Sequence, residues 1–298
     1  MGLKSFLKKT LVSKELDEKL DKIEKPVGSL GYDPWGFNKD TSKIVFSMFG
    51  SIYNKYFRVQ ANGVDNVPAK GPVLLIGNHS GQLPIDGMLV AYAVANRDKS
   101  PRYPRAMIER FFPTVPFLGN FLNELGAVLG DPTNCARMLE NDEAVIVFPE
   151  GIRGSGKLYK DRYQLQRFGS GFVHLAMKHN TPIVPVGVVG CEETIPAIAN
   201  IKPLATLLGG TYIPVALPVL LPAKGSLNFG KPIYFEDEDP GGEQSTRRGE
   251  RVNNYNHERI VTCTLQQHEI YDILQPQTHP RSNRASQVQT ECSRTRQA

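Results

Sequence analysis

Short apolar runs alternate with segments of helical character along the first 235 residues. Val73–Ile76, Ala144–Phe148 and Pro182–Val189 are largely aliphatic and bounded by Gly, Pro or polar residues, which is typical of strands buried on both faces. Gly87–Asn96, which follows Pro84 at the first helical position, and Gly171–His179 are predicted helices. Strands alternating with helices at this interval predict an α/β fold, with a mostly parallel or mixed central sheet covered by helices on both faces.

Two amphipathic segments precede this alternation. Leu3–Ile23 carries leucines and Phe6 at near-helical spacing between lysines and acids, and Thr41–Phe57 is apolar around most of a helix circumference. The lysines of the first segment suit an anionic membrane surface, whereas the acids in its second half would be repelled by it. A peripheral membrane anchor and a helix packed on the domain both agree with the pattern.

The composition divides the chain into three regions. Residues 1–57 form an amphipathic helical N-terminal region with a Gly/Pro linker, and residues 58–235 form the α/β domain. Residues 236–298 form a polar C-terminal extension, which we expect to be disordered from about residue 276 because it is nearly free of large apolar groups.

Charge and cysteine usage narrow the functional classes. A formal net charge of +5 over 298 residues gives little support to a nucleic-acid partner, and the four cysteines form no Cys-x-x-Cys pair, so no metal site or disulfide framework is indicated. The opening residues lack an apolar run of signal-peptide length. The uncharged stretch Leu204–Leu221 is broken by Gly and Pro, and a strand and loop in the core or a membrane-dipping loop both fit it. We expect a cytoplasmic, peripherally membrane-associated protein.

Candidate chemistry gathers after the first buried strand. His79 follows that strand, and Asp86 falls in the first turn of the next helix, so both are expected at the sheet edge where open α/β folds bind ligands. A carboxylate bonded to one imidazole nitrogen fixes the tautomer and leaves the other nitrogen to take a proton, as in a general-base dyad. A turn histidine and an aspartate that offsets the helix dipole are the alternative interpretation.

Four motifs in order resemble the glycerolipid acyltransferase superfamily, which includes lysophosphatidic acid acyltransferases. The resemblance covers about Arg58 to Phe235, and the motifs are Asn78-His79 through Asp86, Phe148-Pro149-Glu150-Gly151, Thr181–Val186 and Phe229–Ile233. It implies that His79 and Asp86 are catalytic and that a substrate-binding set surrounds them, namely Asn78, Phe148, Pro149, Glu150, Gly151 and Arg153. The segment Phe111–Leu125 is expected to form a wall over the active site.

Two departures from the family pattern affect what it implies. Six residues separate His79 from Asp86, where the family has four. In the stretch Gly126–Pro132, Pro132 stands where phosphate-substrate members have an arginine, which weakens the case for a phosphorylated acceptor and leaves diacylglycerol or another lipid alcohol open.

The resemblance implies transfer of a fatty acyl group from a thioester to a glycerolipid hydroxyl. The partners would be acyl-CoA or acyl carrier protein as co-substrate, the lipid acceptor and a peripheral membrane surface, with no further cofactor. A non-catalytic lipid-binding protein on the same scaffold is the alternative. The run Gly151–Lys157 also fits the core of a phosphate-binding P-loop, but Leu158 replaces the magnesium-binding Ser or Thr, which argues against nucleotide hydrolysis.

Overall fold

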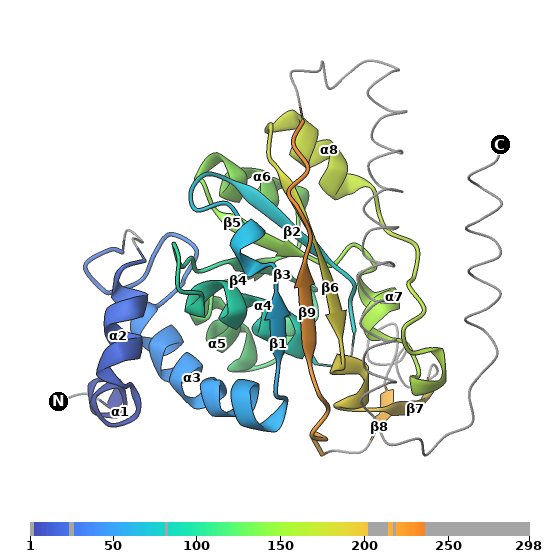
Figure 1. The fold of residues 1–298 in the computed structure, drawn as a ribbon, viewed down its shortest axis with the longest axis horizontal. Helices are drawn as coiled ribbons and strands as arrows, with labels where there is room; N and C mark the ends of the chain where they lie inside the picture. The colour runs from blue at the N-terminus through green and yellow to red at the C-terminus, as the bar shows by residue number, and fades with distance from the viewer. Residues whose placement is uncertain (1–2, 24–26, 81–82, 202–213, 217–218, 236–298) are drawn as a thin grey trace. The chain divides into compact units, whose positions relative to one another are not determined.

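The central feature is a seven-stranded sheet in the order β1-β9-β6-β2-β5-β3-β4 (Figure 1). The computed structural model describes residues 3–23, 27–80, 83–201, 214–216 and 219–235. Neighbouring strands run parallel except at β6 and β9, which pair antiparallel. The strands of this sheet are β1 (Gln60–Asn62), β2 (Val73–Gly77), β3 (Arg105–Ile108), β4 (Ala127–Leu129), β5 (Ala144–Val147), β6 (Ile183–Val189) and β9 (Ser226–Phe229).

Helices cover both faces of this sheet, which confirms the predicted fold class. One buried cluster joins the sheet to α3 and α4, and a second joins its other face to α6 and α8. The α-helices are α1 (Leu3–Leu11), α2 (Lys14–Asp21), α3 (Lys39–Ser51), α4 (Ile85–Asn96), α5 (Leu118–Glu124), α6 (Pro132–Glu140), α7 (Ile152–Ser155) and α8 (Gly171–Lys178).

Strand β2 lies at the centre of the sheet and is buried along its whole length. Val73 and Leu75 belong to the cluster with α3 and α4, whereas Leu74 and Ile76 belong to the cluster with α6 and α8. Successive side chains of a strand point to opposite faces, so a strand covered on both sides must be apolar throughout. This requirement explains the continuous aliphatic run in the sequence.

The N-terminal segment forms two helices where the sequence predicted one. Ser13 interrupts the helix because its side chain accepts a hydrogen bond from the backbone N–H of Leu16 at 3.2 Å and so caps α2. Leu20 is fully buried in the main core, and the buried ammonium of Lys43 on α3 pairs with Asp17 and with Asp21. Helix α2 is therefore packed on the α/β domain.

Some sequence predictions fall on residues outside the described ranges. These are the C-terminal extension 236–298 and most of the stretch Leu204–Leu221. The described part of that stretch includes β8 (Pro214–Ala216), which pairs antiparallel with β7 (Ala197–Asn200) in a separate two-stranded sheet. Among the described residues, no helix has both the length and the hydrophobicity that crossing a bilayer requires.

Candidate active site

The carboxyl ends of four adjacent parallel strands meet along one edge of the sheet. Strand β2 leads into His79, β5 into Glu150, β3 into Glu109 and β4 into Asp131. The strands pair in register, with Ile76 opposite Val147 and Ile108 opposite Leu129, so the residues that follow them emerge at a similar level. Open α/β sheets bind their ligands at this edge.

His79 and Asp86 form the predicted pair. Their Nδ1 and Oδ2 atoms lie 2.6 Å apart, which confirms the expected hydrogen-bond reach despite the six intervening residues. Asp86 is fully buried, and its carboxylate also accepts hydrogen bonds from the backbone N–H groups of Ser80 at 2.9 Å and Gly87 at 2.7 Å. Helix α4 begins at Ile85, so Pro84 occupies the N-cap rather than the predicted first helical position.

The environment of His79 raises the pKa of its imidazole. Burial is the largest influence and lowers this pKa, but the charge of Asp86, its hydrogen bond and the charge of Glu150 together outweigh it. Because Nδ1 is engaged by Asp86, Nε2 is the ring nitrogen available to exchange a proton with a bound molecule. The pair therefore has the arrangement that a general base requires.

The ring of Phe148 fixes the plane of the imidazole. The two rings stack with centroids 4.6 Å apart and an interplanar angle of 14°. Phe148 is itself confined by Gly77, where an added Cβ would lie 3.1 Å from its ring. The stack and the bond to Asp86 hold His79 from two directions.

Glu150 holds the backbone on both sides of the site. Its Oε1 accepts the N–H of His79 at 2.9 Å, and its Oε2 accepts the N–H of Gln166 at 2.8 Å. The side chain is 1% exposed, and burial raises the pKa of its carboxyl while nearby Lys157 opposes that shift. Both carboxylate oxygens are thus engaged by the protein, which makes Glu150 a positioning residue in this geometry rather than a group facing a substrate.

Replacing Glu150 by glutamine should weaken both stability and activity. One amide oxygen cannot accept from two backbone N–H groups that point to opposite sides, so a buried donor is left unsatisfied at a cost of about 1–3 kcal/mol. We expect urea unfolding to show a loss in this range, and steady-state kinetics to show a lower kcat because the His79 backbone is released. Glu18→Gln, at an exposed position on α2, is the matched control and should change neither quantity.

The other predicted substrate-binding residues occupy different places. Asn78 is buried, and its side-chain amide exchanges two hydrogen bonds with the backbone of Val188, which ties the end of β2 to β6. Pro149 accepts the N–H of Gly169 through its carbonyl oxygen at 3.0 Å. Gly151 lines the pocket described below, and Arg153 is exposed on α7. The structure therefore brings Phe148 and Gly151 to His79 and places Asn78 behind it.

Helix α7 packs directly against His79, which limits what Gly151–Lys157 can bind. A Cβ on Gly154 would lie 2.7 Å from the Cβ of His79, so only glycine fits there. Lys157 is buried, with its Nζ 2.6 Å from Glu192 and 3.7 Å from Glu150. A P-loop lysine must reach bound phosphate, and this one is held by two carboxylates, which agrees with the sequence argument against a P-loop.

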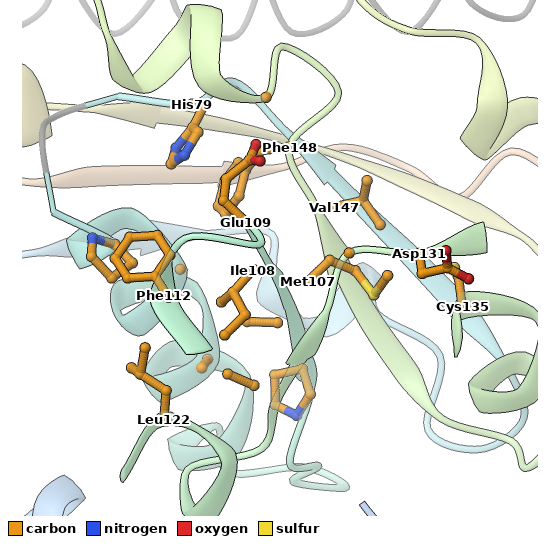
Figure 2. A pocket seen from close by; sticks show the side chains of 18 of the residues that line it. His79, Met107, Ile108, Glu109, Phe112, Leu122, Asp131, Cys135, Val147 and Phe148 are labelled. Atoms are coloured by element: carbon orange, nitrogen blue, oxygen red, sulfur yellow. The ribbon is translucent and has the colours of Figure 1, made fainter. Parts of the chain in front are cut away.

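A cavity of about 350 Å³ opens beside His79 (Figure 2). Its lining is mostly apolar and draws on the sheet, α4, α8 and the segment between β3 and β4. Phe112, Leu122 and Leu125 line it, which confirms the predicted wall for part of Phe111–Leu125, whereas Phe111 and Phe117 are exposed. An apolar cavity with a few polar groups at one end suits a molecule with a long hydrocarbon part.

Glu109 and Asp131 also line this cavity, and sequence reasoning did not identify them as site residues. Glu109 follows β3 directly, and Asp131 follows β4 after one intervening residue. A polar residue just after a strand is also the signal that identified His79. The strands β3 and β4 are only four and three residues long, so their ends were too weakly marked in the sequence to use that signal.

Comparison with known proteins gives three findings. Residues 58–189 match the family model described as Acyltransferase. An "Uncharacterized protein" of Mycobacterium tuberculosis is 37% identical over 221 residues, covering 71% of this chain and 61% of that protein. A chicken protein named "DGAT1/2-independent enzyme synthesizing storage lipids" is 25% identical over 211 residues, covering 68% of this chain and 60% of that one. The chain thus matches about three-fifths of the length of these relatives.

The fold has a counterpart among solved structures. The 1-acyl-sn-glycerophosphate (LPA) acyltransferase PlsC of Thermotoga maritima superposes with a TM-score of 0.50 at 17% sequence identity, covering 76% of this chain and 80% of that one. At this identity the likeness concerns the fold alone. It agrees with the α/β class of the fold described above.

Proposed function

We propose that this chain is a member of the glycerolipid acyltransferase superfamily and that it transfers a fatty acyl group from an acyl thioester to the hydroxyl of a lipid acceptor, with His79 as the general base. The observation that carries the proposal is the His79–Asp86 pair at the end of an apolar cavity. The cavity receives hydrocarbon, and the imidazole is the titratable group whose free nitrogen a hydroxyl can approach.

In the proposed reaction Nε2 of His79 takes the proton of the acceptor hydroxyl as its oxygen attacks the thioester carbonyl. The tetrahedral intermediate then expels the thiolate, which receives the same proton from the imidazolium. One ester bond forms, one thioester bond breaks, and a free thiol leaves. Asp86 orients the ring and stabilises its charged form between the two proton transfers.

The thioester donor, acyl-CoA or acyl carrier protein, carries phosphate groups outside its reactive end. Exposed cations lie on α7, which packs against His79, and on the residues that follow it, and these are Arg153, Lys160, Arg162 and Arg167. Arginine binds phosphate oxygens bidentately, so this segment supports a donor site there.

A peripheral membrane surface is the proposed source of the lipid. Apolar side chains remain exposed on the N-terminal helices after packing, namely Phe6 and Leu11 on α1 and Met48 on α3. These residues support membrane association of that face, and the exposed Lys9 of α1 agrees with it, whereas Lys4 and Lys8 pair with Glu124 and Asp40. The chicken relative's name, which refers to storage lipids, supports a lipid product.

The test incubates the purified full-length chain with labelled acyl-CoA and, separately, lysophosphatidate, glycerol phosphate or diacylglycerol. We expect a labelled ester from at least one acceptor, with free thiol released in equal amount, and far less thiol when acyl-CoA is supplied alone. Chromatography identifies the ester, and a thiol reagent measures the second product. Labelled lipid bound without any product from any acceptor contradicts the proposal and indicates a lipid-binding protein.

A further inference from the structure

Apart from the imidazole of His79, the charged side chains among the described residues that line the cavity are acidic. Among the described lining residues, the ionisable carboxylates are Glu109 and Asp131, and no lysine or arginine is present. The remaining walls are apolar or formed by backbone. A site that receives a phosphate group normally offers it arginine, lysine or a row of backbone N–H groups, and this cavity offers two carboxylates instead.

Glu109 reaches the end of the cavity where His79 lies. Its Oε1 is 3.3 Å from the position that a Cβ on Gly151 would occupy, so its carboxylate extends from β3 toward the loop after β5. Glu109 lines the same cavity as Phe148, whose ring stacks on His79, and Figure 2 labels all three side chains. A head group close enough to present its hydroxyl to His79 is therefore also close to Glu109.

Asp131 lies farther along the cavity near Cys135 and is held in its charged form (Figure 2). Its side chain accepts the N–H of Thr133 at 2.8 Å as the N-cap of α6, and this hydrogen bond is the main reason that the pKa of its carboxyl is lowered. The cation recorded beside it, Arg110, is 4.0 Å away, 81% exposed and outside the cavity lining. Asp131 therefore brings a negative charge to the cavity lining, and the cation that pairs with it is not itself a lining residue.

We propose that Glu109 and Asp131 select an uncharged lipid alcohol as the acceptor by repelling the phosphate of a phosphorylated one. This inference rests on the proposed function, because it concerns the acceptor of the same site. A phosphomonoester carries close to two negative charges at neutral pH, and like charges in a partly desolvated cavity disfavour each other. Pro132, which follows Asp131, adds no donor of its own because proline lacks a backbone N–H.

The test compares two acceptors that differ only in the phosphate, monooleoylglycerol and oleoyl lysophosphatidate. Dissociation constants are measured for the full-length chain by competition with a fluorescent fatty acyl probe, in 30 mM and 500 mM salt. We expect wild type to bind the uncharged lipid at least about tenfold more tightly in low salt, equivalent to about 1.4 kcal/mol, and to lose part of that preference in high salt.

In wild type, we compare the dissociation constant of lysophosphatidate with that of monooleoylglycerol. The double variant Glu109→Gln and Asp131→Asn should lower the ratio of these two constants, because it should bind lysophosphatidate more tightly. Asparagine is also a favoured N-cap residue, so α6 keeps its cap, and a thermal melt checks folding. Glu140→Gln, at an exposed position on the same helix as Asp131, is the matched control and should leave the ratio unchanged.

The inference is overturned if wild type binds lysophosphatidate more tightly than monooleoylglycerol. It is also overturned if the double variant leaves the ratio of the two dissociation constants unchanged. Turnover of the same two lipids separates it from the proposed function. A preference in binding without any ester formed contradicts catalysis and supports the selection, whereas ester formed mainly from lysophosphatidate supports catalysis and contradicts the selection.

Discussion

Replacing His79 by alanine is expected to lower kcat for acyl transfer by about 10²–10⁴-fold, the range that a positioned general base contributes. Without the imidazole, the described lining residues hold no other nitrogen base, and the carboxylate of Glu109 remains at that end of the cavity. A carboxylate such as that of Glu109 accepts a hydroxyl proton less readily than an imidazole does. Initial rates of thiol release at saturating donor and acceptor measure the effect.

The His79→Ala variant should still bind lipid, because the apolar walls of the cavity remain. Competition with a fluorescent acyl probe checks this, and a thermal melt shows whether the fold is intact. His174→Ala, at an exposed position on α8, is the matched control and should retain full activity. Activity within a few-fold of wild type in His79→Ala, with the fold intact, would remove His79 from the mechanism.

Replacing Asp86 by asparagine should lower kcat by about 10²-fold or more while His79 stays in place. The amide must serve the Nδ1 atom of His79 and the backbone N–H groups of Ser80 and Gly87 with a single oxygen. If its NH₂ group turns to Nδ1, the proton moves to Nε2, and the nitrogen that should accept the hydroxyl proton is blocked.

The pH profile distinguishes this effect from simple loss of structure. In wild type, activity should rise with pH as His79 loses its proton, with a midpoint above the ordinary histidine pKa because Asp86 and Glu150 outweigh the effect of burial. Removing the charge of Asp86 lowers the pKa of His79, so the midpoint of the residual activity should move to lower pH. A midpoint that does not move would contradict the assigned pairing. Asp98→Asn, at the exposed end of a surface ion pair, is the control.

The N-terminal helices show a limit of pattern reading. The spacing of Leu3–Ile23 is amphipathic, but an apolar stripe is equally suited to lipid and to a protein core. For α2, the second half of this segment, two observations decide in favour of a protein core. Leu20 is buried in the main core, and Asp17 and Asp21 form ion pairs with the buried ammonium of Lys43. The position of α2 is therefore fixed by Lys43, which lies more than twenty residues further along the chain.

Glu150 shows a second case in which the sequence pattern does not determine the role of a side chain. Its motif resembles a substrate-binding one, and the sequence supports that interpretation because a glutamate after a buried strand is expected at the ligand-binding edge. The structure turns the side chain inward, where the backbone N–H groups of His79 and Gln166 satisfy it. Which way a side chain turns at a strand end depends on donors contributed by other segments, and these donors are backbone groups that carry no sequence signature.

The sequence by itself determined the α/β class and the buried central strand, because each depends on local periodicity. It placed His79 and Asp86 at one strand end and the next helix start but left their pairing open, and the 2.6 Å contact between Nδ1 and Oδ2 decided it. The tertiary structure alone decided that Glu150 accepts the backbone N–H of His79, that Lys157 pairs with carboxylates, and that Glu109 and Asp131 line the cavity. These arrangements arise when strands distant in sequence become neighbours in the sheet. Charge and burial at the site are properties of that assembly, so no single segment encodes them.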